Sequence, residues 1–112
     1  MTEDGHRQAA AQLRESRARL DRVPDIRLST EASFGIAHHL TAAGAQRKHG
    51  VHREEHQGLS RWLRDRQEAE MAARIDELEQ MRIGRWYGRQ ENGHAADRQD
   101  ELLVAIAAWS VA

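Results

Sequence analysis

The sequence predicts an all-α protein, a four- to five-helix up-and-down bundle that forms one domain over residues 1–112. The chain has a single proline and no alternating run of β-branched residues, so there is little basis for strands. Good helix formers, chiefly Ala, Arg, Glu, Gln and Leu, dominate every long segment. A chain of 112 residues supports one modest core and is too short for a two-domain enzyme with a deep cleft.

The first predicted helix covers about residues 2–22 and has a thin apolar stripe at Ala9, Leu13 and Leu20. It stops at Val23 because the proline that follows disfavours helical geometry in the residue before it.

The second predicted helix begins at an N-cap on Ser29 or Thr30, and Glu31 lies in its first turn, near the positive end of the helix dipole. Its inward face is rich in small residues and therefore favours close helix packing. That face consists of Ala32, Ile36, His39, Leu40 and Ala43. Residues 44–50 (GAQRKHG) have a glycine at each end, and we expect them to connect this helix to the next.

Three further helices follow. Residues 51–66 form the third, and residues 68–87 form the fourth, which stops at Gly88. The polar residues 89–95 form a loop, and the last helix starts at Ala96 or Asp97. The inward side chains of the third and last helices are Leu59, Trp62, Leu63, Leu102, Ile106 and Trp109.

Arg82 interrupts the apolar stripe of the fourth predicted helix. On a helical wheel of about 100° per residue it falls among Met71, Ile75, Leu78 and Trp86. A buried guanidinium costs on the order of several kcal/mol unless it is paired, so we expect Arg82 to meet an acidic or hydrogen-bonding partner there or across an interface. The alternative is an arginine that lays its stem on the core and extends its head to water.

Composition limits the classes of partner and the compartment. The chain has 17 Lys and Arg, 18 Asp and Glu and a formal net charge of −1, so nucleic-acid binding would have to be local. The lack of cysteine excludes disulfides, thiol catalysis and cysteine-ligated zinc. No apolar run approaches the roughly 18 residues that span a bilayer, and the start of the chain, MTEDGHRQ, lacks a signal pattern. We expect a cytoplasmic protein without a membrane partner.

Two histidines have the spacing of metal ligands. His52 and His56 are four residues apart, and with Glu55 they match the H-x-x-E-H pattern of inverted zinc proteases. Such a site needs a third ligand from a separate element and a substrate cleft, and a domain of this size lacks room for both. A solvated polar face explains the pair better, so we predict no metal ligand and no cofactor.

Other histidines are candidates for proton transfer. Two strings, Arg47 to His52 and Arg89 to His94, have four residues between an arginine and a histidine. This is the outline of a ribonuclease motif in which arginine holds the phosphate and histidine acts at the 2′-hydroxyl without a metal. His39, on the inward face of the second helix, is a further candidate beside Arg82, and otherwise a hydrogen-bonded core histidine.

A cation cluster lies at the end of the fourth predicted helix. It consists of Arg82, Arg85 and Arg89, with Tyr87 between them. These four are the candidate ligand-binding residues, because arginines hold phosphates and an aromatic ring stacks on a base. The alternative is an ordinary basic helix end favoured by the helix dipole.

Four stretches, in order, resemble small bacterial members of the HEPN superfamily of helical nucleotide-binding domains. They are the Ala-rich EASFGIAHHLTAAGAQ, then HGVHREEHQGLSRWL, then IDELEQMRIGRWYG and the closing helix DRQDELLVAIAAW. The resemblance covers about residues 7–110. It implies a homodimer in which the fourth helices meet, RNA or a nucleotide as ligand, and Arg82 as the motif arginine.

The chain departs from the family pattern beyond that arginine. Ile83 stands where a polar residue is usual, and Tyr87, Gly88 and Arg89 stand where the histidine belongs. The resemblance therefore implies a degenerate, non-catalytic member that binds a nucleotide, RNA or a partner protein such as an antitoxin, in a bacterial defence or toxin–antitoxin system.

Two alternatives remain open. One is a metal-independent ribonuclease in which Arg82 clamps the phosphate and His39 or His94 handles the proton. The other is a purely structural helical adaptor in which Arg82 pairs with a carboxylate and no ligand binds.

Overall fold

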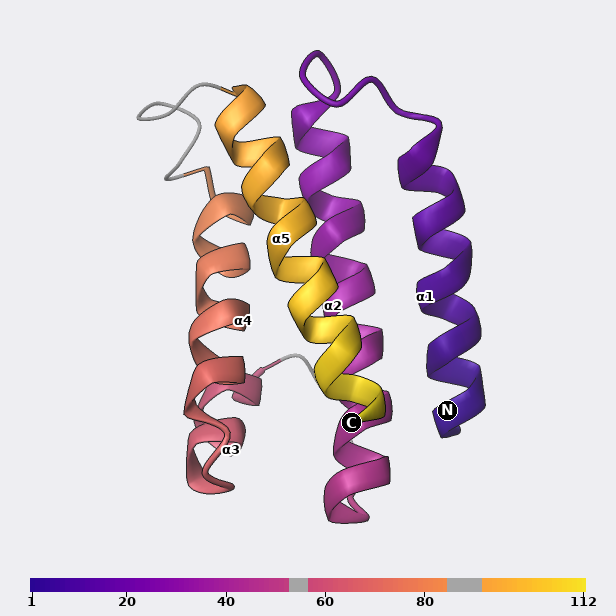
Figure 1. The fold of residues 1–112 in the computed structure, drawn as a ribbon, viewed down its shortest axis with the longest axis vertical. Coiled ribbons are helices and arrows are strands. Elements are labelled where there is room, and N and C mark those ends of the chain that lie inside the picture. Colours follow the sequence, from indigo (N-terminus) through magenta and orange to yellow (C-terminus); the bar gives the residue numbers. More distant parts are fainter. Residues whose placement is uncertain (53–56, 85–91) are drawn as a thin grey trace.

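The computed structural model describes residues 1–52, 57–84 and 92–112, and within these ranges it contains five helices and no strand (Figure 1). The helices are α1 (Glu3–Ala18), α2 (Ile26–His49), α3 (Leu59–Asp65), α4 (Ala69–Arg82) and α5 (Asn92–Val111). Helices α1, α2, α4 and α5 run alternately up and down, and the short α3 lies beside the start of α4. The predicted all-α bundle is confirmed. None of the described helices is long and apolar enough to cross a membrane.

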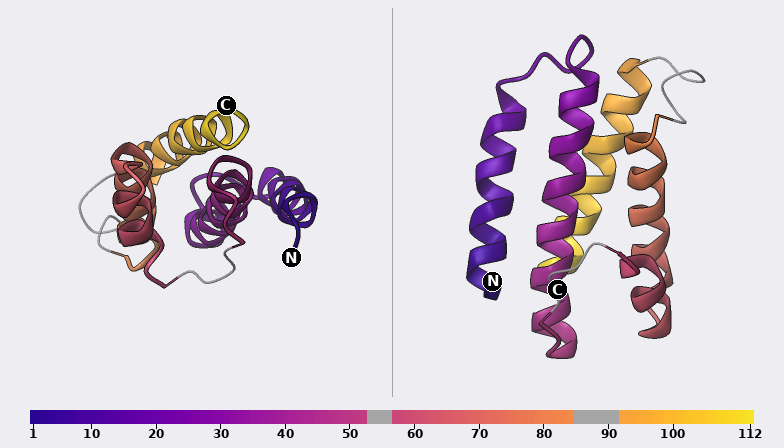
Figure 2. Two further views of the ribbon diagram at one scale, coloured as in Figure 1. Left: turned by 90° about the horizontal axis from the view of Figure 1, so that it is seen from below. Right: turned by 180° about the vertical axis from the view of Figure 1, so that it is seen from behind.

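Helix α2 lies at the centre of the molecule. Seen end-on, it stands between α1 on one side and α4 and α5 on the other (Figure 2). It is buried around most of its circumference, from Ile26 to Ala45. Small and hydroxyl-bearing residues make this possible: the hydroxyls of Thr30 and Thr41 donate to backbone carbonyls one turn earlier, each at 2.7 Å, so few polar atoms need water.

The main core lies between α2, α4 and α5. Its fully buried members include Ile36, Leu78, Met81 and Ile106, with Leu63 from α3. Burial of each such side chain contributes about 1.5–3 kcal/mol to folding. The inward positions predicted for α3, α4 and α5 at Leu59, Leu63, Ile75, Leu78, Leu102 and Ile106 are confirmed.

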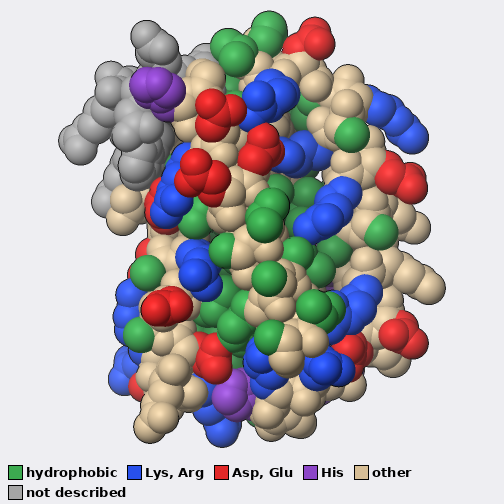
Figure 3. All heavy atoms as spheres, viewed as in Figure 1, with side chains coloured by type: hydrophobic (Ala, Val, Ile, Leu, Met, Phe, Trp, Pro, Cys, Tyr) green, Lys and Arg blue, Asp and Glu red, His purple; other side chains and the backbone are tan. Residues whose placement is uncertain are grey.

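Polar contacts connect the outer helices across the bundle. Arg17 and Arg22, at the end of α1 and just beyond it, each donate to Asp100 of α5 at 2.7 Å. Near the other end, Arg7 donates to the carbonyl of Ser110 at 2.8 Å. On the opposite side of α5, Arg98 holds Glu77 of α4 through two hydrogen bonds. Figure 3 shows basic and acidic side chains around a centre of hydrophobic side chains over α5.

Several predicted helix boundaries were wrong. Helix α1 ends at Ala18 rather than near residue 22, and α2 begins at Ile26 rather than after Ser29 or Thr30. Helix α2 then continues through the predicted connection 44–50 as far as His49. It ends only at Gly50, whose φ of 67° is the left-handed conformation that glycine adopts most easily.

The later boundaries also shift. The described part of the third helix is only Leu59–Asp65, and α4 stops at Arg82, before Gly84 with its φ of 84°. Helix α5 begins at Asn92, inside the predicted polar loop.

Candidate functional site

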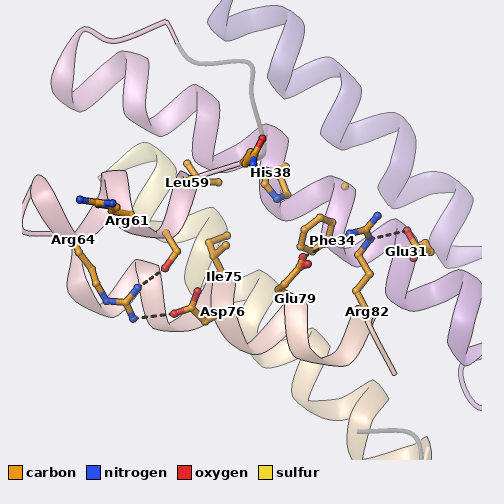
Figure 4. A pocket seen from close by; sticks show the side chains of 14 residues that line it. Glu31, Phe34, His38, Leu59, Arg61, Arg64, Ile75, Asp76, Glu79 and Arg82 are labelled. Carbon is orange, nitrogen blue, oxygen red and sulfur yellow. Dashed lines mark hydrogen bonds and ion pairs between the residues drawn. The ribbon is translucent and has the colours of Figure 1, made fainter. Parts of the chain in front are cut away.

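The candidate site is a groove of about 970 Å³ between α2 and the α3–α4 pair (Figure 4). Its apolar wall is formed by Phe34, Leu59 and Ile75. Three arginines and three carboxylates surround that wall. The charged residues are Glu31, Arg61, Arg64, Asp76, Glu79 and Arg82.

An aromatic pair from α2 forms one side of the groove. Phe34 and His38 are four residues apart and therefore share a helical face. Their rings meet edge to face, with centroids 4.4 Å apart. Both side chains are largely buried, so only a small part of each ring is available to a ligand.

Arg82 lies at one end of the groove with its guanidinium in water. Its Nε is 3.3 Å from Oε2 of Glu31, its Nη1 is 3.7 Å from Oε2 of Glu79, and its Cζ is 4.7 Å from the centre of the Phe34 ring. The side chain is 41% exposed. The stem therefore faces α2, as the helical wheel predicts, but the head reaches solvent because α4 ends at this residue. The structure shows the second of the two expected arrangements of Arg82.

We expect Arg82→Ala to lower the free energy of unfolding by only about 1 kcal/mol, because exposed ion pairs and an exposed cation–π contact contribute little. Urea unfolding of the variant beside Arg14→Ala, an exposed arginine on α1, measures this difference. A loss of about 3–5 kcal/mol would instead indicate that a buried partner charge is stranded, and would contradict the exposed geometry.

Arg61 and Arg64 reach the groove from α3. Arg64 donates to Oδ2 of Asp76 at 2.9 Å and also to the hydroxyl of Ser60. Arg61 is exposed and forms no hydrogen bond or ion pair with any residue in the described ranges. The lining thus has three arginines and three carboxylates. Of the three arginines, Arg61 is the one that has no ion-pair partner among the described residues.

The proposed histidines lie elsewhere. His39 faces α1, where its Nδ1 is 3.0 Å from Nδ1 of His6, and His94 is exposed in the first turn of α5; neither lines the groove. The histidine that does line the groove with Arg82 is His38. Arg85, Tyr87 and Arg89 lie outside the described residues, as do Glu55 and His56 of the H-x-x-E-H pattern.

Sequence reasoning missed His38, Arg61 and Arg64. It assigned a single inward face to the second helix, whereas α2 is central and has two: His39 faces α1 and His38 faces the groove. The signal was present, since α2 is apolar or small around most of its circumference, as is typical of a helix surrounded by others. Arg61 and Arg64 had no comparable signal, because only the packing of α3 on α4 brings them to the groove.

Burial lowers the pKa of His6, and the neighbouring imidazole of His39 lowers it further. Among the described residues, no group of three or more histidine or acidic side chains is placed to hold a metal ion.

Comparison with known proteins yields no relative. No family model, no curated protein and no solved structure matches this chain. The resemblance to the HEPN superfamily therefore stays a prediction that rests on the sequence stretches alone.

Proposed function

We propose that this chain is a non-catalytic, HEPN-like helical module that binds a nucleotide in the groove between α2 and α3–α4. The observation that carries the proposal is that Arg61, Arg64 and Arg82 all line one groove, together with the Phe34–His38 pair. A volume of about 970 Å³ suits a small organic ligand.

The groove separates two kinds of contact. The apolar wall and the accessible parts of Phe34 and His38 suit a base, whereas the guanidinium groups suit a phosphate. Arg61 is the principal phosphate ligand because it has no partner to give up among the described residues. Arg64 and Arg82 are in exposed ion pairs, which exchange partners at a cost of about 1 kcal/mol or less.

The three carboxylates of the lining favour a ligand with a single phosphate. Glu31, Asp76 and Glu79 balance the three arginines, and the whole chain has a net charge of −1. A long polyanion would therefore meet repulsion as well as attraction along the groove. We infer a nucleoside monophosphate or the terminal nucleotide of an RNA as ligand, rather than a duplex.

Calorimetric titration with the four ribonucleoside 5′-monophosphates tests the proposal. We expect Arg61→Ala to weaken binding about 10- to 100-fold, the effect of losing one hydrogen bond between charged groups. The matched control is Arg14→Ala, an exposed arginine on α1 that does not line this groove and should leave binding unchanged. Absence of binding by the folded wild-type protein, or equal loss in both variants, would contradict the proposal.

The ribonuclease alternative has one observation in its favour, since the groove places a histidine, His38, together with Arg82. Incubation with a mixed RNA pool in EDTA separates the two functions. We expect no cleavage; cleavage that disappears in a folded Arg82→Ala variant would instead establish a metal-independent ribonuclease. If the protein neither binds a nucleotide nor cleaves RNA, the structural adaptor is the remaining function.

The homodimer, the antitoxin-type partner and the defence setting belong to the same proposal. The described surface favours α5 over α4 for contact with a second copy. Val104 and Val111 of α5 are 71% and 57% exposed, whereas α4 exposes no large hydrophobic side chain within its bounds. Ile83, directly after it, is 52% exposed.

A further inference from the structure

On the side of α2 that faces α1, two histidines face one another. His6 of α1 and His39 of α2 are 33 residues apart in sequence, yet their Nδ1 atoms are 3.0 Å apart. Their ring centroids are 5.2 Å apart and the planes are inclined by 43°. His6 is 5% exposed, and His39 is partly buried.

The distance between the two nitrogens permits two arrangements. In the first, one neutral ring donates its Nδ1–H to the other, and a single proton lies between them. In the second, a metal ion replaces that proton. Tetrahedral zinc binds imidazole nitrogens at about 2.0–2.1 Å, which places two such nitrogens roughly 3.3 Å apart, so only a small outward movement is needed.

The surroundings favour a ligand that needs neutral imidazole. Burial and the neighbouring ring disfavour the imidazolium form of His6, and a metal ion binds the neutral form. The two ligands come from different helices, so a bound ion would also join the start of α1 to α2.

We propose that His6 and His39 form a two-imidazole binding site for a divalent transition metal ion of the zinc and copper class. Water completes the coordination, because the described residues supply no third histidine or acidic ligand in position. Such a site is of moderate affinity and binds imidazole-seeking metals in preference to magnesium or calcium. It is separate from the nucleotide proposal, because His38 and not His39 lines the groove.

Zinc titration of the untagged protein at pH 7.5 tests the site. We expect uptake of one Zn²⁺ per chain, a higher Tm with Zn²⁺, and a shift of the ring resonances of His6 and His39 in the NMR spectrum. Magnesium should produce none of these effects.

Two variants and one control identify the ligands. His39→Asn should abolish the uptake of zinc, and His6→Asn should do the same if it folds. His39 is more exposed than His6, so the His39→Asn variant is a sufficient test if His6→Asn does not fold. His94→Asn, an exposed histidine of α5, should retain full uptake. No uptake by the wild-type protein, or uptake that persists in folded His39→Asn, would overturn the proposal and leave a simple hydrogen bond between the two rings.

Discussion

Gly44→Ala is expected to destabilise the protein by about 1–3 kcal/mol or more, because the added methyl group overlaps a packed indole ring. A Cβ at Gly44 would contact the Trp109 ring at three atoms, with Cε3 at 2.8 Å and Cη2 at 3.0 Å, and Cζ3 closer still. The ring has little freedom to move. Its Nε1 donates to Glu68, and the Nζ of Lys48 lies 5.3 Å from its centre. Thermal and urea unfolding measure the loss.

Gly93 is the matched control. It also lies in a helix, and a Cβ there would meet nothing within 4 Å. Gly93→Ala should therefore be neutral or stabilise the protein by up to about 1 kcal/mol, the difference in helix propensity. In a Trp109→Leu background the cost of Gly44→Ala should shrink. An equal cost in both backgrounds would show that the indole ring is not the obstacle.

Gln99→Ala should lower the free energy of unfolding by about 2–5 kcal/mol, because it removes buried volume together with two hydrogen bonds. Gln99 is fully buried in α5. Its Nε2 donates to the hydroxyl of Thr30 at 2.7 Å, and its Oε1 accepts from the hydroxyl of Ser33 at 2.9 Å. This amide is thus the polar centre of the contact between α2 and α5.

Gln99→Leu separates the volume from the hydrogen bonds. Both hydroxyls have a backbone carbonyl acceptor one turn earlier in α2. Thr30 donates to that of Ile26, and the single proton of Ser33 can go to that of Ser29 when Gln99 is absent. The leucine variant should therefore lose about 1–3 kcal/mol, less than the alanine variant. Gln80→Ala, at an exposed position of α4, should change stability by about 0.5 kcal/mol or less. Equal effects of Gln99→Ala and Gln80→Ala in urea unfolding would contradict the buried network.

The helical state and the core positions of α4 and α5 could be predicted because they depend on local signals. Leu78, Leu102 and Ile106 recur at helical spacing, and each is buried as that spacing predicts. The helix boundaries were harder to predict from the sequence. Gly44 looked like a helix end, yet α2 continues through it, and the Trp109 ring occupies the space that a side chain at this position would need.

The site could be predicted only in part. Arg82 was singled out by its place on the wheel, and it does face α2 from the end of α4. Its exposure could not be derived, since it depends on α4 ending at that residue. The wheel of a single helix also cannot tell which neighbour covers which side. His39, predicted to lie beside Arg82, faces His6 of α1 instead, and His38 lines the groove.

Helix propensity and periodicity act within a few turns, so the helical state of this chain and the core-facing residues of α4 and α5 follow from the order of its amino acids. The composition also determined that charge is balanced overall, so that any site for an anion must be local. Only the tertiary structure decided that α2 lies at the centre, that Arg61 reaches the groove and that His6 meets His39. Those outcomes depend on which helices pack side by side. Contacts between residues far apart in the chain select that arrangement.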